Sequence, residues 1–313
     1  RQQKIKRRIA EAVGMNISAE ERALYYGERL AEVIRCKTVS KKDGFEAAEF
    51  LKLREVIKKL FPLMTEKAEL RILGDDAYLY KIKGRDESRN VMVMSHHDVV
   101  DATGDWQEEP FAGVIRDGKL WGRGTVDTKT PLFAEFSAIE ELLGEGFEFP
   151  VNTYLFSSHN EEYGGDGALL ALDYFNENNI KFEWIMDEGG AIIDPPMAGI
   201  SKRCAMMAVH EKGRCTAQLT ASSKPGHAGL EGGHKTPVMR MVAFMAETDE
   251  NPPFIRRLHP EVRGMFEALA PHMSFPMKFV FSNLWLFSGL LIKLMPVFFK
   301  VFCNGFKVKF GVS

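Results

Sequence analysis

Hydrophobic positions in the first 60 residues repeat at helical spacing. Apolar side chains recur every three to four residues over 18–37 and again over 46–60, which predicts two amphipathic helices. Ser18 and Glu21 form a capping-box pattern at the start of the first helix. Pro62 follows the second helix and should end it, because proline cannot continue the helical hydrogen bonds.

From residue 68 onward the pattern changes to strands that alternate with helices. Residues 91–94 (VMVM) are a continuous apolar run, which is typical of a strand buried on both faces. Asp117-Gly118 suits a tight hairpin turn within 113–122. The other expected elements are strands at 68–73, 77–83, 151–157 and 183–186 and helices at 131–143 and 167–178. Such alternation predicts an α/β sandwich with a mostly parallel central sheet.

The pattern changes again after residue 212, where we expect a smaller α+β unit. Its predicted elements are a strand at 213–221, a helix at 235–247 and a strand at 306–312. The sequence therefore predicts two domains, 1–212 and 213–313. Residues 279–292 are apolar and uncharged, but they are fewer than the ~20 residues that span a bilayer. We expect a buried or interface helix there, with membrane contact through 279–302 as the alternative.

Composition narrows the possible partners and compartment. Hydrophobic residues make up 45% and charged residues 27% of the 313 residues, as in soluble globular proteins. The net charge of −2 gives no indication of a nucleic-acid partner. The four cysteines are scattered without a CxxC pair, which favours a reducing compartment and hence a cytoplasmic location. The chain does not begin with Met, so a targeting segment could precede it.

Four clusters of histidine and acidic residues carry the candidate chemistry. They read SHHDVV (95–100), GRGTVDTKT (122–130), SSHNEEYGG (157–165) and IMDEGG (185–190). Three of them follow a predicted strand, and ligands of α/β sheets bind beyond the carboxyl ends of the strands. Imidazole and carboxylate ligands suit a zinc-type hydrolytic site. Together the clusters supply His96, Asp98, Asp127, Glu161, Glu162 and Asp187.

The spacing within each cluster indicates roles, although each cluster alone also has an ordinary structural interpretation. Asp98 lies two residues after His96, on the same side of a strand, where a carboxylate can orient a metal-bound imidazole. Asp127 could bridge two cations or simply cap a helix. Glu161 and Glu162 could divide the tasks of binding metal and accepting a proton. At 187–188 either carboxylate could bind, on chemistry alone.

These motifs resemble a known family. The chain is similar to the co-catalytic zinc metallopeptidases and amidohydrolases that include carboxypeptidase G, aminoacylase, acetylornithine deacetylase and succinyl-diaminopimelate desuccinylase. The vacuolar carboxypeptidase S and N-acyl-amino-acid hydrolase branch looks nearest. The family motifs H-x-D-V-V, G-R-G-x-x-D-x-K, E-E-x-G-G and D-E-G match residues 96–100, 122–129, 161–165 and 187–189.

The resemblance implies a fold and a pair of metal ions. The fold would be a three-layer sandwich with an inserted lid domain, incomplete in this chain. The cofactors would be two Zn²⁺ ions, with Co²⁺ or Mn²⁺ as substitutes. His96 and Asp187 would hold one ion, Glu162 would hold the other, and Asp127 would bridge them.

The resemblance also implies the catalytic residues, the partners and one backbone feature. Glu161 would be the general base and Asp98 would orient His96. His227 would reach into the active site of a second copy, in a homodimer formed through the lid. The peptide bond after Asp127 would be cis. The substrate would be a small peptide or an N-acyl amino acid, cleaved at its amide bond.

One family feature is not matched. The family's last zinc ligand, a histidine, and the substrate-binding Asn and Arg of the lid would lie beyond Ser313, and His259 and His272 stand in the wrong context to replace that ligand. We therefore expect the chain to be a fragment of a longer protein. The alternative function is a catalytically incomplete module that only binds or dimerises.

Overall fold

The structure is a computed structural model, and its chain divides into two compact units, residues 1–189 and 190–313. The predicted domain boundary at 212 stays a prediction. The described residues are 18–42, 44–188, 191–194, 200, 202–208, 216–222, 236–252 and 258–293.

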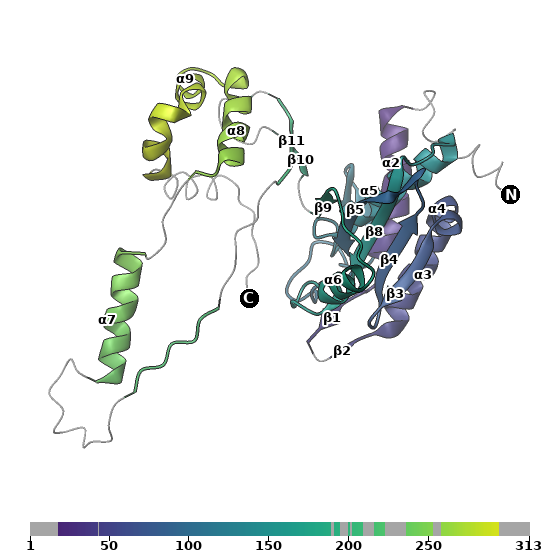
Figure 1. The fold of residues 1–313 in the computed structure, drawn as a ribbon, viewed down its shortest axis with the longest axis horizontal. Coiled ribbons are helices and arrows are strands. Elements are labelled where there is room, and N and C mark those ends of the chain that lie inside the picture. The colour runs from purple at the N-terminus through teal and green to yellow at the C-terminus, as the bar shows by residue number, and fades with distance from the viewer. Residues whose placement is uncertain are drawn as a thin grey trace. The chain divides into compact units, whose positions relative to one another are not determined.

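A five-stranded sheet forms the centre of the first unit (Figure 1). Its strands, in spatial order, are β3 (Glu69–Leu73), β4 (Ala77–Ile82), β8 (Val151–Ser158), β5 (Asp86–His96) and β9 (Ile185–Met186). The pairs β3–β4 and β4–β8 are antiparallel, whereas β8–β5 and β5–β9 are parallel. The α/β class is confirmed, but the sheet is mixed, so a mostly parallel sheet is not confirmed. The reason is local: the turn at 74–76 is too short for a crossover, so β4 returns antiparallel to β3.

Helices cover both faces of this sheet. On one face lie α2 (Ala19–Ile34), α3 (Ala47–Leu60), α4 (Pro62–Lys67) and α5 (Lys129–Glu145), whose buried side chains share one hydrophobic core with the strands. On the other face α6 (Gly167–Glu177) packs over a second, smaller core. Figure 1 shows α6 on one side of the strands and α3 and α4 on the other.

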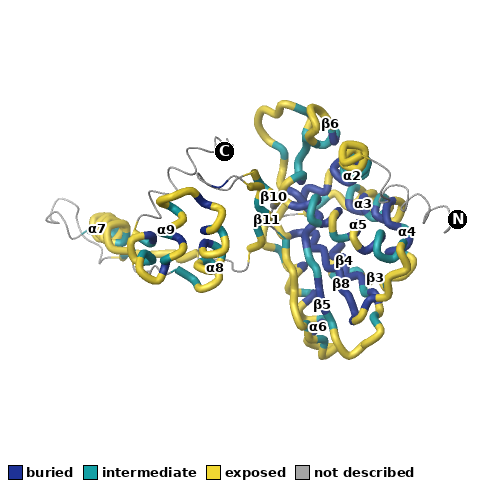
Figure 2. Tube along the Cα trace, turned by 90° about the horizontal axis from the view of Figure 1, so that it is seen from above, coloured by how far each residue is buried: buried dark blue, intermediate teal, exposed yellow. Residues whose placement is uncertain are grey.

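The two-residue period of the strands produces this division. Tyr78 and Tyr80 of β4 point into the larger core, whereas Ala77 and Leu79 point into the smaller one. Every residue of β8 is buried, and Leu155 has no exposed surface. Figure 2 shows the same central strands in the colour of buried residues. Helices cover both faces of the sheet, which explains why the sequence of its central strands is continuously apolar.

Local signals in the sequence set the ends of the first helices. Ser18 Oγ accepts a hydrogen bond of 3.1 Å from the Glu21 N–H, and the Ser18 N–H donates to the Glu21 carboxylate at 2.8 Å, so the capping box is confirmed. Helix α3 ends at Leu60, as predicted. Pro62 does more than stop it, since it is also the first residue of α4, where its missing N–H costs nothing.

The hairpin predicted within 113–122 is present, and β3 and β4 form another. The β3–β4 turn contains Gly74 with φ of 55°, a conformation in which glycine is favoured. The second hairpin joins β6 (Val114–Arg116) to β7 (Lys119–Trp121). Its two turn residues, Asp117 and Gly118, both have positive φ, 53° and 68°, as a type I′ turn requires.

The second unit contains short strands followed by helices. These elements are β10 (Ala191–Ile193), β11 (Cys204–Met206), α7 (Pro237–Glu250), α8 (Pro260–Leu269), the 3₁₀ turn Ala270–His272 and α9 (Met277–Ser282). Helix α7 confirms the helix expected at 235–247. The strand expected at 213–221 is wrong for its described part, because residues 216–221 are not in a strand. The strand expected at 306–312 lies outside the described residues.

The apolar segment 279–292 is helical, interrupted at residue 283, and packs on one side only. Phe281 and Leu284 are buried against Phe266 of α8 and its neighbours, whereas Phe279 and Trp285 are exposed. Across the described residues, helices of bilayer-spanning length and hydrophobicity do not occur. The segment therefore contributes to a small core of the second unit.

The burial of Leu155 gives a stability prediction. Replacing Leu155 with Ala should lower the free energy of unfolding by about 2–5 kcal/mol, because a cavity remains in the larger core. Leu169→Ala on α6 is the control, since Leu169 is 62% exposed, and should change stability by less than about 0.5 kcal/mol. Urea unfolding of the three proteins measures both values. Equal losses in the two variants would contradict the assigned layers.

Candidate metal centre

His96 is the last residue of β5, and its ring is held from one side. The side chain is 1% exposed. Its Nδ1 lies 3.0 Å from the backbone oxygen of Asp98 and 3.3 Å from the Asp98 carboxylate. The predicted i, i+2 relation is therefore present in the structure. Because Nδ1 is engaged by Asp98, Nε2 is the nitrogen that faces the remaining acidic groups.

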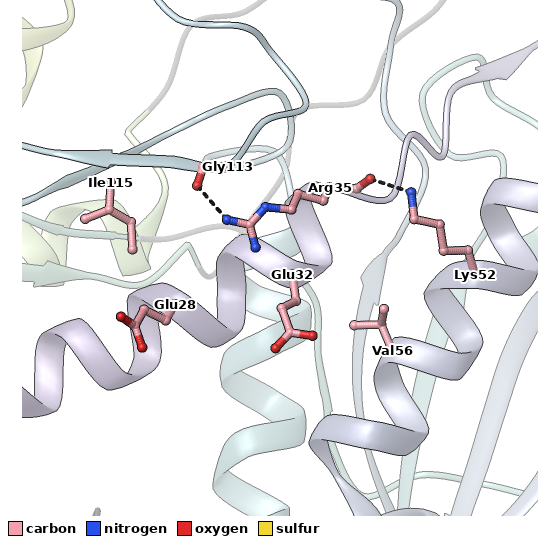
Figure 3. Close-up of a pocket in the computed structure, with 7 residues that line it drawn as sticks. All are labelled: Glu28, Glu32, Arg35, Lys52, Val56, Gly113 and Ile115. Carbon is pink, nitrogen blue, oxygen red and sulfur yellow. Dashed lines mark hydrogen bonds between the residues drawn. The ribbon is translucent and has the colours of Figure 1, made fainter.

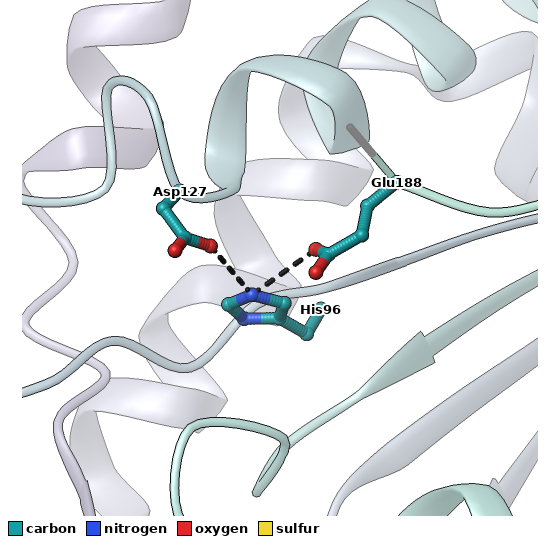
Figure 4. A group of neighbouring side chains, drawn as sticks. All are labelled: His96, Asp127 and Glu188. Carbon is teal, nitrogen blue, oxygen red and sulfur yellow. Dashed lines mark hydrogen bonds and ion pairs between the residues drawn. The ribbon is translucent and has the colours of Figure 1, made fainter. Parts of the chain in front are cut away.

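Three carboxylates surround that nitrogen. Asp127 Oδ1 lies 2.9 Å, Glu188 Oε2 3.1 Å and Glu161 Oε2 3.7 Å from His96 Nε2. Figure 4 shows Asp127 and Glu188 approaching the ring from two sides. The ligand atoms of His96, Asp127 and Glu188 all lie within 4.8 Å of one another. We call these three residues the metal group.

The donor set of the metal group fits a cation such as zinc. One ring N–H cannot satisfy several carboxylates, and one imidazole nitrogen with carboxylate oxygens is a typical Zn²⁺ ligand set. The Oε2 of Glu188 is buried and faces His96 Nε2 at 3.1 Å. Burial by itself would lower the pKa of His96, but hydrogen bonds to Asp98 and Glu188 and their charges raise it to about 11. A proton therefore occupies the position at which a cation would bind, and the two compete.

Asp98 connects three separate segments of the chain. Its carboxylate is fully buried and accepts hydrogen bonds from the Ser40 hydroxyl and, at 3.2 Å each, from the backbone N–H groups of Glu161 and Glu162. Burial alone would raise the pKa of Asp98, but the hydrogen bonds from His96 and Ser40 lower it below its usual value. An ionised Asp98 thus fixes both the ring of His96 and the turn that carries the two glutamates.

The two glutamates occupy different positions in that turn. Both glutamates donate their backbone N–H to Asp98, but of their two carboxylates only that of Glu161 forms an ion pair with His96 in the described structure. Burial raises the pKa of Glu161 despite the opposing charge of His96. Burial and the charge of Asp127 raise the pKa of Glu162 to about 7. Both carboxylates are therefore poised to hold a proton closer to neutral pH than a solvated glutamate.

Asp127 projects from a loop that a buried lysine anchors. The Asp127–Thr128 peptide bond is cis, which confirms the expectation from the family resemblance. Lys129 is fully buried, and its ammonium donates to the backbone oxygens of Val33 at 3.4 Å and Cys36 at 2.5 Å, at the end of α2. The start of α5, and with it Asp127, is thereby fixed to the end of another helix.

The structure differs from the sequence-based choice at the last cluster. Glu188, not Asp187, lies in the metal group, while the exposed Asp187 carboxylate accepts a 2.8 Å hydrogen bond from the Glu188 N–H. Asp187 as a metal ligand stays a prediction, as does His227, which lies outside the described residues. Ser40 was missed because no motif links it to Asp98. Glu135, which accepts a hydrogen bond from Ser95 beside His96, was also missed, and its one signal is an acidic residue among apolar helix positions.

A cavity formed by described residues lies away from the metal group (Figure 3). It has a volume of about 650 Å³ and lies between α2, α3 and the β6 hairpin. Its two cations are already engaged: Arg35 donates to the Ala112 and Gly113 oxygens, and Lys52 donates to the Arg35 oxygen and to Glu49. The cavity therefore does not define the functional site. Its lining residues are Glu28, Glu32, Arg35, Lys52, Val56, Gly113 and Ile115.

The sheet and the metal group define the class: an α/β protein with a candidate metal centre at the carboxyl ends of its parallel strands. Residues 92–274 match the model of Peptidase family M20/M25/M40, which is more than half of the chain. The chain belongs to this family. All the residues of the metal group lie within the matched range, so the family assignment and the geometry concern the same part of the molecule.

Relatives and solved structures agree with this assignment. The chain is 34% identical over 278 residues to "Probable carboxypeptidase S-like 2" of Dictyostelium discoideum, covering 86% of this chain and 53% of that protein. It is 30% identical over 295 residues to human "N-fatty-acyl-amino acid synthase/hydrolase PM20D1", covering 91% and 58%. The chain thus spans about half the length of the curated relatives it matches. Human carnosine dipeptidase 1 shares the fold, with a TM-score of 0.53 at 16% identity over 88% of this chain and 60% of that chain.

The position of Asp98 predicts a pH-dependent stability. Asp98→Asn should lower the free energy of unfolding of the metal-free protein by about 3 kcal/mol at pH 7, because buried donors lose their charged acceptor. The folded pKa of Asp98 is below its unfolded value, so its contribution is present above about pH 4 and is lost as pH falls through the folded pKa. The difference between the two proteins should therefore shrink below about pH 4.

Urea unfolding between pH 3 and 7, in the presence of a chelator, measures this difference. Asp173→Asn on the exposed side of α6 is the control and should shift stability by less than about 0.5 kcal/mol at any of these pH values. A difference for Asp98→Asn that does not change with pH would show that its charge is not what stabilises the fold.

Proposed function

We propose that the whole protein is a metal-dependent hydrolase that cleaves an amide bond in a peptide or an N-acyl amino acid. The observation that carries the proposal is the convergence of Asp127 and Glu188 on Nε2 of a buried histidine. The names of the relatives support the substrate class, since they describe carboxypeptidases and hydrolases of N-fatty-acyl amino acids. Fold alone would not support it, because one fold serves many functions.

The cofactors in this proposal are two Zn²⁺ ions, which Co²⁺ or Mn²⁺ could replace. His96 and Glu188 would hold one ion, Glu162 would hold the second and Asp127 would lie between them. When bound, zinc supplies a Lewis acid that lowers the pKa of water and polarises a carbonyl group. The protein supplies the arrangement: Asp98 fixes the imidazole, and the buried Lys129 holds the loop that presents Asp127.

Glu161 is the proposed general base. Its carboxylate lies at the metal group without being part of it, 3.7 Å from Nε2 of His96. Its raised pKa brings the carboxylate closer to the range in which it can accept a proton at Oε2 and later release it. Glu161 would take the proton of the attacking water and deliver it to the nitrogen of the leaving amine.

The partners and location in this proposal rest on the family resemblance. A homodimer formed through the second unit would bring His227 of one copy to the metal centre of the other, where it would stabilise the developing negative charge on the substrate oxygen. A cytoplasmic location would agree with the scattered cysteines.

The proposed division between the two glutamates can be tested directly. In the full-length protein, Glu161→Gln should retain most of its bound zinc and lose turnover of dipeptides and N-acyl amino acids by at least about 100-fold, because a general base contributes about 10²–10⁴-fold. Glu162→Gln should lose zinc. Zinc content by elemental analysis and turnover with and without a chelator are the two measurements.

The outcomes separate the candidate functions. Equal zinc loss in both variants would refute the division of roles. A wild-type protein that binds zinc but cleaves none of these substrates would favour the alternative of a binding or dimerisation module.

The last cluster gives a second test. Glu188→Gln should weaken zinc binding by about 10-fold or more, whereas the neighbouring Asp187→Asn should change it much less, because Glu188 is the residue that faces His96. Competition with a chromophoric chelator measures both dissociation constants. The reverse order would assign the ligand to Asp187.

A further inference from the structure

A carboxylate outside the family motifs lies beside the metal centre. Glu135 is in the second turn of α5, among the buried apolar side chains of that helix. Its Oε2 accepts a hydrogen bond of 3.0 Å from the Ser95 hydroxyl. Ser95 is 3% exposed and immediately precedes His96 in β5. Glu135 therefore contacts the strand end from which His96 projects.

A second connection is electrostatic. Burial raises the pKa of Glu135 to about 8, and the charges of Asp187 and Glu188 act in the same direction, while the Ser95 hydrogen bond opposes them. The Glu135 carboxylate is thus close enough to interact electrostatically with the carboxylates of Asp187 and Glu188, which follow β9. It adjoins both parallel strands that carry the site, β5 through a hydrogen bond and the segment after β9 through charge.

A neighbouring carboxylate shows what a purely structural acidic residue looks like in this helix. Glu140 is also buried in α5, at 2% exposure. Its two oxygens accept hydrogen bonds from the backbone N–H groups of Leu63 at 3.1 Å and Met64 at 2.7 Å, which fixes the start of α4. Those contacts account for Glu140 without reference to the metal centre. The contacts of Glu135 point to the metal centre instead.

We infer that Glu135 is a positioning residue of the metal centre, which holds Ser95 beneath His96 and carries negative charge beside Glu188 when a divalent cation is bound. The charge of the cation favours the ionised form of a buried carboxylate that is otherwise largely protonated at neutral pH. This inference rests on the proposed function, because it assumes that the metal group binds a divalent cation. Outer carboxylates and hydroxyls around metal ligands orient those ligands and change metal affinity by about 10–100-fold. A carboxylate placed here would strengthen cation binding without touching the ion.

The experiment measures zinc affinity, the Co²⁺ absorption spectrum and the stability of the metal-free chain. Glu135→Gln keeps an acceptor oxygen for Ser95 but removes the charge, and should weaken zinc binding by about 10-fold. Glu135→Leu removes both and should weaken it further and alter the d–d bands of bound Co²⁺. Ser95→Ala cuts the hydrogen bond but leaves the charge, and should give an intermediate loss.

Glu140→Gln is the matched control, a buried carboxylate on the same helix, and should leave the zinc dissociation constant and the Co²⁺ spectrum unchanged even if it lowers stability. If both Glu135 variants bind zinc with wild-type affinity and lose only stability, the inference is overturned. The proposed function would then remain intact. A wild-type chain that binds neither Zn²⁺ nor Co²⁺ would overturn both.

Discussion

The candidate site depends on one buried carboxylate. Asp98 accepts hydrogen bonds from Ser40, from the ring of His96 and from the turn that holds Glu161. These donors come from three parts of the chain, and Ser40 lies 58 residues from Asp98 in sequence. A backbone hydrogen bond from the Ser40 N–H to the Val99 oxygen ties two of these segments together. In a buried environment each donor would lose several kcal/mol without an acceptor, so the ionised carboxylate determines where the other groups lie.

Around that fixed point the site concentrates negative charge. Asp127, Glu161 and Glu188 approach one imidazole nitrogen. Burial, together with repulsion from neighbouring carboxylates, raises the pKa of Glu161 and Glu162. Repulsion of this kind opposes folding, and a bound divalent cation would offset it. A metal ion that binds here would therefore stabilise the fold, because a ligand that binds only the folded state stabilises it.

Family membership and the positions of individual side chains describe this protein at two different levels. Family membership places the motifs on a shared fold, and the sheet carries three of the four clusters at strand ends. Glu188 reaches His96, while its neighbour Asp187 is exposed, so a shift of one residue along the segment after β9 exchanges the carboxylate that faces the metal group. Function follows from such positions and not from the fold.

Much of the fold, and the centre of the site, could be predicted from the sequence because the signals are local. Helical spacing, the Ser18 capping box and the Asp117-Gly118 turn each act within a few residues, and His96 and Asp127 stand in short motifs. Tertiary structure decided the rest. The mixed sheet depends on which strand edges meet, and the choice of Glu188 depends on the direction in which the chain leaves β9. Ser40 and Glu135 joined the site through contacts between distant segments, and neither hydrophobic period nor motif spacing contains that information, because it arises only when the layers pack.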